Sequence, residues 1–382
     1  MGPTVGLVLA DLGAEVIKIE PLGGDKTRRL RGSGAGYFVM YNRNKKSICI
    51  DLKSAEGKAV ASRLVAGADV LVENFRPGAM EKLGYGYAAL SADNPGLIYC
   101  SARGFLSGPY EHRTALDEVA QMMGGLAYMT GPPGRPLRAG ASVIDVVGGM
   151  FGVIGILAAL EQRHATGRGQ QVTSALFEST AFLVGQHMAQ YAVTGTPAPP
   201  MPVRVSAWAV YDIFDTADGE QVFVAVVSDT QWRKFCEAFE LTAFAADSSL
   251  AENSARVAAR DRIIPAVQTL FKTYGKQELM GKLEQVGLPY APIARPEDLF
   301  DDPHLNESGG LLDVSLPESD SDASATRLPS LPIHMDGRRF GVTRDVPKPG
   351  EQCRDVLAAA GYAEAEIEAL LNGGVVQEAS GD

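Results

Sequence analysis

Residues 136–170 read PLRAGASVIDVVGGMFGVIGILAALEQRHATGRGQ, and this stretch predicts one long helix buried in a core. Asp145 stands directly before an uncharged run from Val146 to Leu160, where its carboxylate could accept the first free backbone N–H groups. Basic residues and two glycines close the stretch, as is typical of a helix C-terminus. The run is shorter than the roughly 20 residues that span a bilayer. The sequence therefore predicts an acid at the mouth of a core helix.

Small residues recur along this run, among them Gly148, Gly149, Gly152 and Gly155. Glycine lowers helix stability by about 1 kcal/mol relative to alanine, so these positions indicate close approach of another backbone or a ligand. Two roles for Asp145 stay open. Its position alone favours a helix cap, which is the common role of an acid before a helix. A carboxylate held at that place can also attack a carbonyl carbon.

The composition is that of a soluble globular protein large enough for two domains. The chain has 382 residues, of which 46% are hydrophobic and 21% charged. Its formal net charge of −11 argues against nucleic acid as the main partner. The four cysteines form no close pair and no signal peptide is visible, which favours a reduced, cytoplasmic protein without a membrane partner. The five histidines show no metal-ligand spacing, so no metal site is expected.

Charged residues elsewhere give two further candidates. One is an early basic cluster, which fits either an anion site or a solvated face. Its members are Lys26, Arg28, Arg29, Arg31, Arg43, Lys45, Lys46 and Lys53. The other is the pair Asp117 and Glu118, at the start of a helix predicted over 117–129. The pattern favours two first-turn acids, and the same residues could orient a partner or act as a base.

Strands alternate with helices through the first half of the chain. The strands are expected at 15–20, 47–52, 69–75, 97–103 and 170–176. This alternation predicts a parallel, Rossmann-like α/β sheet with right-handed crossovers. Ligands of such sheets bind at the carboxyl ends of the strands. Here those ends carry Glu20, Lys53, Asn74, Phe75 and Arg103.

A proline-rich stretch at 194–206 reads as a linker, and the pattern changes after it. A hairpin and several helices follow, which predicts a small α+β domain. We therefore expect a large α/β domain over 1–205 and the small domain over 206–310. Residues 311–382 are expected to form a return linker and C-terminal helices that pack on the large domain.

Several segments of this chain match one known family in the family's order. They are GPTVGLVLADLGAEVIKIE (2–20), GDKTR (24–28), NRNKKSICIDLKSAEGK (42–58), ADVLVENFRPGAMEKLG (68–84), NPGLIYCSARGF (94–105), DEVAQMMGGLAYMTG (117–131) and DVVGGMFGVIGILAALEQRHATGRGQQV (145–172). Together they resemble the class III coenzyme A transferases, the CaiB/BaiF family that includes formyl-CoA transferase and the 2-methylacyl-CoA racemases. The resemblance spans nearly half the chain, and the C-terminal half matches only in general layout.

The resemblance implies an enzyme that moves CoA between an acyl-CoA donor and a carboxylic acid. In the family, an aspartate at the position of Asp145 attacks the acyl-CoA thioester and forms an acyl–aspartyl anhydride. The released CoA thiolate then forms an aspartyl thioester, from which the acceptor acid is loaded. Asp117 matches an active-site acid of the family. CoA is thus implied as a substrate, with no prosthetic group.

The resemblance also implies where CoA binds and how the chains assemble. Ile50 and Lys53 match adenine and phosphate contacts, Asn74 and Phe75 match a wall beside pantetheine and adenine, and Lys82 and Leu83 match a second basic–apolar pair. The early basic cluster would then serve the CoA phosphates. Family members form an interlocked homodimer, which is the assembly expected here.

The chain departs from the family pattern at three places. It starts at Met1–Gly2–Pro3, so the strand that precedes this motif in the family is not part of the sequence. Leu116 stands where the racemases carry a histidine base, and 194–208 lacks the glycine-rich loop of formyl-CoA transferase. The missing histidine and the missing glycine-rich loop favour transfer between other acids, whereas the missing strand fits a protein without catalysis. The alternatives are a 2-methylacyl-CoA racemase or epimerase and a non-catalytic CoA-binding protein. Arg103, Arg138 and Arg204 are candidates to read a second carboxylate of the substrate.

Overall fold

The computed structural model describes residues 1–204, 206–316 and 324–379. The chain forms two compact units: the first contains Met1–Val203 and Pro303–Asp382, and the second contains Arg204–Asp302. Residues 303–310, expected in the small domain, therefore group with the first unit. Residue 205 at the expected boundary, and residues 317–323 and 380–382 of the expected return segment, lie outside the described residues.

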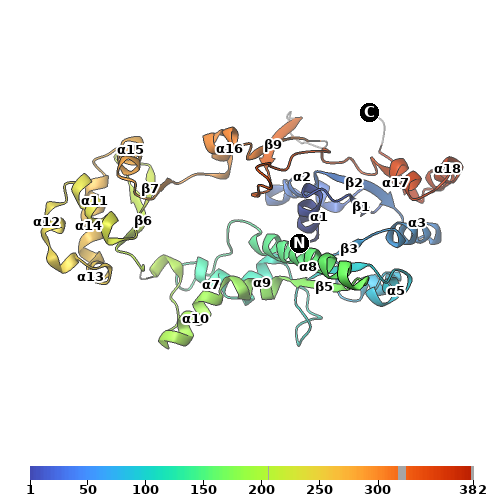
Figure 1. Cartoon of the computed structure of the whole chain (residues 1–382), viewed down its shortest axis with the longest axis horizontal. Coiled ribbons are helices and arrows are strands. Elements are labelled where there is room, and N and C mark those ends of the chain that lie inside the picture. Colours follow the sequence, from blue (N-terminus) through green and yellow to red (C-terminus); the bar gives the residue numbers. More distant parts are fainter. Residues whose placement is uncertain (205, 317–323, 380–382) are drawn as a thin grey trace. The chain divides into compact units, whose positions relative to one another are not determined.

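Helices and strands alternate through the first unit (Figure 1). It begins with α1 (Gly2–Asp11), β1 (Val16–Glu20), α2 (Tyr37–Asn42), β2 (Lys45–Ile50), α3 (Ala55–Ala66), β3 (Val70–Glu73), α4 (Ala79–Leu83), α5 (Tyr87–Asp93) and β4 (Ile98–Arg103). It continues with α6 (Asp117–Met123), α7 (Leu126–Thr130), α8 (Val143–Thr166), β5 (Gln171–Ala175), α9 (Leu176–Leu183) and α10 (Gly185–Thr194). Its C-terminal part adds α16 (Pro303–Glu307), β9 (Leu311–Ser315), β10 (Ala325–Pro329), α17 (Cys353–Ala359), α18 (Glu364–Asn372) and β11 (Val376–Gln377).

The parallel strands belong to two sheets, where the sequence predicts one. Strand order is β1-β2-β11 in the first sheet and β3-β4-β5 in the second. Neighbours are parallel except that β11 runs antiparallel to β2, with Val376 opposite Ile50. The N–H of Asp51 also donates to the carbonyl of Val375 at 2.8 Å. The chain's C-terminal strand thus occupies the free edge of β2, which is why that sheet ends there.

Helix α8 packs against α1 and the strands β4 and β5, and Figure 1 shows it between α1 and β5. A Cβ atom at Gly149 would lie 2.7 Å from Cβ of Thr4 in α1, and one at Gly155 would lie 2.5 Å from Cγ1 of Val172 in β5. Such distances leave no room for a side chain at either position. The glycines of α8 therefore allow close packing by neighbouring elements of the fold, and the expected close approach of a ligand to them is not needed.

Helix α8 is longer than the uncharged run suggests, with 24 residues. Among the described residues it is the one helix long and apolar enough to cross a membrane, so the expectation that the run is too short is wrong. Core helices of soluble proteins meet the same criterion, and Val153 and Ile156 are buried with Val5 and Ile98. Removing a side chain of this size from water contributes about 1.5–3 kcal/mol. The packing thus makes α8 the central core helix of the first unit.

The C-terminal helices of the first unit pack beside its first strands. Val356 and Leu357 of α17 and Ile367 of α18 share a buried cluster with Ile48 of β2 and Val60 of α3. The cluster joins residues about 300 positions apart in the sequence. The end of the chain therefore stabilises the sheet by packing against its central strand β2.

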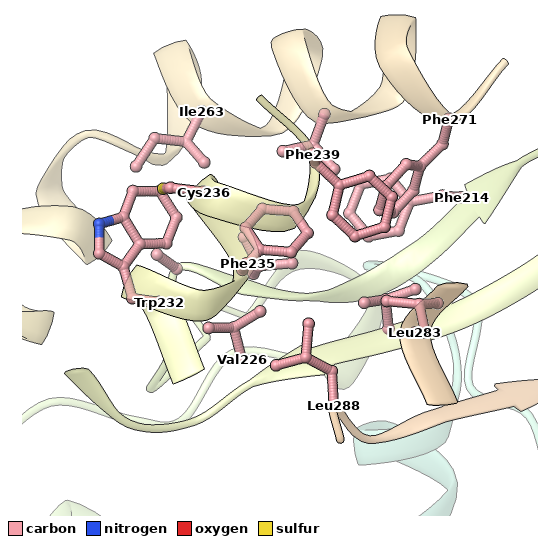
Figure 2. Close-up of a cluster of buried hydrophobic side chains, with 14 of the residues drawn as sticks. Phe214, Val226, Trp232, Phe235, Cys236, Phe239, Ile263, Phe271, Leu283 and Leu288 are labelled. Carbon is pink, nitrogen blue, oxygen red and sulfur yellow. The ribbon is translucent and has the colours of Figure 1, made fainter. Parts of the chain in front are cut away.

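The second unit is an α+β fold with its own core. It contains β6 (Val210–Asp215), β7 (Gln221–Val226), α11 (Asp229–Ala238), α12 (Thr242–Ala246), α13 (Asn253–Ala258), α14 (Arg260–Phe271), α15 (Lys276–Val286) and β8 (Tyr290–Pro292). Its strands are antiparallel in the order β6-β7-β8. Figure 2 shows aromatic side chains gathered in the core, where the ring centroid of Phe239 lies 5.1 Å from that of Phe235 and 5.2 Å from that of Phe271. Aromatic pairs at such centroid distances stabilise a core beyond their buried area.

Candidate active site

Asp117 supplies the helix cap that the sequence assigns to Asp145. It is the first residue of α6 and is 7% exposed. Its Oδ2 accepts the backbone N–H of Ile144 at 2.8 Å and that of Asp145 at 3.0 Å. Asp145 itself is the third residue of α8, after Ser142 at the N-cap, so its prediction as the cap is wrong. The cap comes from a helix nearly 30 residues earlier, and spacing within one helix cannot reveal such a partner.

The second oxygen of Asp117 is held by side chains. Gln121 donates to Oδ1 at 2.5 Å, and the guanidinium of Arg138 lies 3.5 Å from the same atom. Arg138 also pairs with Glu118 at 2.9 Å, and its Nε donates to the carbonyl of Ala139. The hydrogen bond to Glu118 raises the pKa of Arg138, with a further contribution from the charge of Asp117. Asp117 is therefore a buried and well-connected carboxylate that fixes the start of α8.

The carboxylate of Asp145 is much more accessible than that of Asp117. Its side chain is 40% exposed, and its Oδ1 accepts a hydrogen bond from the Met1 nitrogen at 2.9 Å. The first turn of a helix carries partial positive charge, which favours a carboxylate there. Because the backbone N–H of Asp145 is bound by Asp117, the residue is anchored while its side chain stays reachable. This arrangement suits an oxygen nucleophile.

Two tyrosines of α2 face the same helix terminus, and the sequence analysis missed them. The hydroxyl of Tyr37 lies 3.2 Å from that of Ser142, the N-cap of α8. Tyr41 follows one turn later on the same face of α2. Burial raises the pKa of Tyr41, and the charges of Asp145, Tyr37 and Asp117 raise it further. Burial and these charges therefore both disfavour the phenolate form of Tyr41. The i, i+4 tyrosine spacing was the available signal.

The predicted wall residues Asn74 and Phe75 follow β3, and Asn74 lies beside the chain start whose nitrogen contacts Asp145. A Cβ atom at Gly2 would lie 3.0 Å from Cγ of Asn74, so Asn74 borders the start of α1. The side chain of Met1 contacts α8, since a Cβ atom at Gly148 would lie 2.6 Å from Cε of Met1. The start of α1 therefore joins the carboxyl end of β3 to the first turns of α8. Phe75 follows Asn74 and is 55% exposed.

The other predicted CoA contacts differ in how a ligand could reach them. Ile50 is 1% exposed within the cluster formed with α17 and α18, so an adenine ring has no access to its side chain. Lys53 is exposed in the turn after β2, and Lys82 is exposed in α4. Leu83 is half-buried against the core. Two of these four residues therefore offer cationic side chains to solvent at the predicted positions.

Much of the early basic cluster is internal and paired, which makes it a poor anion surface. Arg28 is bound through two nitrogens to the buried carboxylate of Glu20. Burial opposes the charge of Glu20, but hydrogen bonds from Arg28 and Ser47 outweigh it and lower the pKa of Glu20. Arg43 pairs in the same way with buried Asp11 at 2.6 Å. The members left exposed are Lys26, Arg29, Arg31 and Lys53. The sequence shows the basic residues of this cluster but not the buried carboxylates with which they pair.

The arginines considered as readers of a second carboxylate are engaged in the fold. Arg138 is held by Asp117 and Glu118, and Arg103 contacts Glu73 at 2.9 Å and the carbonyl of Phe75 at 3.0 Å. Arg204 is the first residue of the second unit. Within residues 1–204, 206–316 and 324–379, no group of three His, Cys, Asp or Glu side chains is placed to hold a metal ion.

A model of the family described as CoA-transferase family III matches residues 1–353. The chain belongs to this family. This family III CoA-transferase is 37% identical over 377 residues to the succinate–glutarate CoA-transferase of Agrobacterium fabrum, covering 94% of this chain and 91% of that protein. It is 34% identical to the succinyl-CoA:mesaconate CoA-transferase of Haloarcula hispanica, over 91% of this chain and 88% of that protein.

The fold of the family III CoA-transferase agrees with a solved relative. A CaiB/BaiF family protein from Brucella suis superposes with a TM-score of 0.80 and 33% identity, covering 94% of this chain and 95% of that one. The predicted family is thereby confirmed, and so are its mixed α/β architecture with parallel sheets and its enzyme type. Family and relatives together support transfer of CoA between an acyl-CoA and an acid.

Proposed function

We propose that this family III CoA-transferase carries the acyl group and then CoA on Asp145. The observation that supports this most is the carboxylate of Asp145, which is 40% exposed at the start of α8 while its backbone is fixed by buried Asp117. A carboxylate nucleophile replaces one difficult acyl transfer by successive easier ones. Anchoring it to a core helix keeps the attacking oxygen in one place, which lowers the entropic part of the barrier.

The proposed reaction has four steps that return Asp145 to its starting state. An oxygen of Asp145 attacks the thioester carbonyl, and the C–S bond breaks to give an acyl–aspartyl anhydride and CoA thiolate. The thiolate attacks the aspartyl carbonyl and releases the donor acid, leaving an aspartyl–CoA thioester. The acceptor carboxylate displaces CoA to form a second anhydride. CoA thiolate then attacks the acceptor acyl carbon, which yields the new acyl-CoA and frees Asp145.

The residues near Asp145 fit supporting roles in these reaction steps. Each attack places negative charge on a carbonyl oxygen, and donors aimed at that oxygen lower the barrier. The phenol of Tyr41 is the proposed donor, because it lies one turn after Tyr37, whose hydroxyl is 3.2 Å from that of Ser142 at the start of α8. Asp117 acts on α8 through two hydrogen bonds and keeps the reactive carboxylate in register. Asp117 is thus proposed as a positioning acid.

We propose CoA binding along the carboxyl ends of β2 and β3. Exposed Phe75 and Asn74 would line the coenzyme beside Asp145, and exposed Lys53 and Lys82 would meet its phosphates. Half-buried Leu83 would add an apolar contact behind these residues, and buried Ile50 would support β2 from inside the core without touching the coenzyme. Leu116, 67% exposed beside Asp117, cannot serve as the histidine base of a racemase, which leaves transfer as the favoured chemistry.

The names of the relatives suggest succinyl-CoA as donor and a dicarboxylic acid as acceptor. The test is a mass-spectrometric exchange assay in which succinyl-CoA is mixed with a panel including glutarate and mesaconate. We expect a new acyl-CoA with at least one acid, formed without net hydrolysis. Deuterium entry at C2 of a 2-methylacyl-CoA without any acceptor would indicate racemisation. Binding of CoA without exchange toward any acid would support a non-catalytic protein.

We also propose that the protein is a homodimer in the cytoplasm. Apolar side chains are exposed along one side of α8 and on α9 and α10. They are Met150, Ile154, Leu157, Phe182, Met188 and Val193. An exposed apolar surface of this kind marks an interface. All four cysteines are free and buried, which fits a reducing compartment.

Charge placed on the exposed side of α8 is expected to break the dimer. The double variant Ile154→Lys, Leu157→Lys should sediment with the mass of one chain where the unmodified protein sediments as two, because lysine ammonium groups cannot be buried unpaired. Ile213→Lys, at a 49% exposed position of the second unit, is the matched control and should stay dimeric. A monomeric unmodified protein, or a double variant that stays dimeric, contradicts the proposal.

A further inference from the structure

The ion pair between Glu73 and Arg103 forms a clamp that holds the main chain of Phe75 from both sides. The N–H of Phe75 donates to Oε2 of Glu73 at 2.9 Å, and its carbonyl accepts from Nη1 of Arg103 at 3.0 Å. The ion pair is closed by Nη2 of Arg103, which lies 2.9 Å from Oε1 of Glu73. This last contact is electrostatic and falls outside hydrogen-bond geometry. Strand β3 ends at Glu73 and β4 ends at Arg103, so the clamp joins the carboxyl ends of both strands.

Burial makes this clamp rigid and sensitive to substitution. The side chain of Glu73 is 1% exposed and that of Arg103 is 13% exposed. A buried charge that loses its partner is strongly unfavourable, so each member holds the other in place. Arg103 also lies 3.4 Å from the hydroxyl of Ser101, which further limits its rotation. Both hydrogen-bonding groups of the Phe75 main chain are thus occupied by fixed side chains.

The held residue carries an exposed ring at the ligand end of the sheet. Phe75 is 55% exposed, although a phenylalanine side chain is favoured inside a core. Carboxyl ends of parallel strands are where ligands of such sheets bind. A ring whose main chain is already ordered loses less conformational entropy when a ligand packs on it. The arrangement therefore fits preorganisation of an apolar contact.

We propose that the Glu73–Arg103 ion pair is a positioning device, which fixes the Phe75 main chain and presents its ring to the coenzyme part of the acyl-CoA. This inference rests on the proposed function, in which Phe75 lines the CoA site. It assigns Arg103 a role in coenzyme affinity, and it excludes Arg103 as a reader of the substrate's second carboxylate. The chemical steps at Asp145 do not pass through the clamp.

Arg103→Met removes the clamp while keeping a chain of similar length. We expect the KM for acyl-CoA and the calorimetric Kd for CoA to rise roughly tenfold, the effect of losing a charge-assisted hydrogen bond. The kcat at saturating acyl-CoA and the KM for the acceptor acid should change by less than about twofold. Arg103→Lys restores a cation beside Glu73 and should recover part of the affinity. Glu73→Gln keeps an acceptor for the Phe75 N–H but removes the charge that holds Arg103. It is the variant to measure if Arg103→Met does not fold.

The opposite ends of the same strands provide a matched control. Arg163 pairs with Asp69 at 2.8 Å and donates to the carbonyl of Gly96 at 3.0 Å, just before β3 and β4 begin. Arg163→Met removes a similar ion pair and main-chain contact, at a smaller cost in stability because the side chain of Asp69 is 76% exposed, and it should leave the KM for acyl-CoA unchanged. An equal rise in KM in both variants would show that the clamp acts only through the general stability of the fold, and it would overturn the proposal.

Phe75→Ala separates this inference from the proposed function on which it rests. If Phe75→Ala raises the KM for acyl-CoA and Arg103→Met does not, the clamp is wrong while the CoA site stands. If Phe75→Ala leaves that KM unchanged, the placement of CoA at Phe75 is wrong as well. A rise in both variants, without a rise for Arg163→Met, is the result that we expect.

Discussion

Replacing Asp145 by alanine is expected to abolish CoA transfer. The variant lacks the oxygen that forms both covalent intermediates, so kcat should fall by on the order of 10⁴-fold or more, as it does when an enzyme loses its nucleophile. The fold should persist, because the side chain is 40% exposed and accepts its hydrogen bond from the nitrogen of Met1 at the chain start. The measurement is exchange of label between succinyl-CoA and an acceptor acid, followed by mass spectrometry.

The opposite end of the same helix supplies the control for Asp145→Ala. Glu161 is an acid of α8 whose side chain is 87% exposed, and it lies far along the helix from Asp145. Glu161→Ala should keep the unmodified kcat, and both variants should keep the calorimetric affinity for CoA. Transfer in Asp145→Ala at more than about one-tenth of the unmodified rate would be incompatible with a covalent role for this residue.

Asp117→Ala is expected to lower both stability and turnover. It leaves the N–H groups of Ile144 and Asp145 and the amide of Gln121 without their acceptor. Unpaired buried donors of this kind reduce the free energy of unfolding by about 1–3 kcal/mol. The first turn of α8 also loses its anchor, and a displacement of about 1 Å at a reacting atom lowers kcat by about 100-fold. Urea unfolding and steady-state exchange measure the two effects.

Asp117→Asn distinguishes the charge of this residue from its hydrogen bonds. The amide oxygen can still accept both α8 N–H groups, so most of the lost stability should return. If kcat returns with it, Asp117 acts by holding α8, which is the role that we propose. If stability returns and kcat stays low, the negative charge takes part in the reaction. An alanine variant with unchanged stability and kcat would refute the assigned cap.

Local patterns were enough to predict the elements that form from neighbouring residues. The strand–helix alternation gave the parallel strands, and the glycine-rich apolar run gave α8. The placement of Asp145 at the N-terminal end of α8 also followed from the sequence, because a charged residue beside a long apolar run marks a helix terminus. Its catalytic interpretation came from the resemblance to a family, since position alone favoured a cap.

Features that depend on distant partners could not be predicted in this way. Asp117 caps α8 from another helix, and two-residue β11 closes the edge of β2 from the end of the chain. The sequence predicts an anion site or a solvated face for the basic cluster. Arg28 and Arg43 instead pair with Glu20 and Asp11 inside the fold. Each case requires knowing which buried group lies opposite, and that is fixed by tertiary packing.

Chemical trapping at Asp145 tests the proposed covalent route most directly. The protein is incubated with succinyl-CoA and hydroxylamine, digested, and the peptide that contains Asp145 is sequenced by mass spectrometry. We expect a hydroxamate at Asp145 that forms only when the acyl-CoA is present, because hydroxylamine attacks an aspartyl thioester or anhydride. Continued CoA transfer with no hydroxamate at Asp145, or with the hydroxamate on another carboxylate, would contradict the assignment of Asp145 as the covalent carrier.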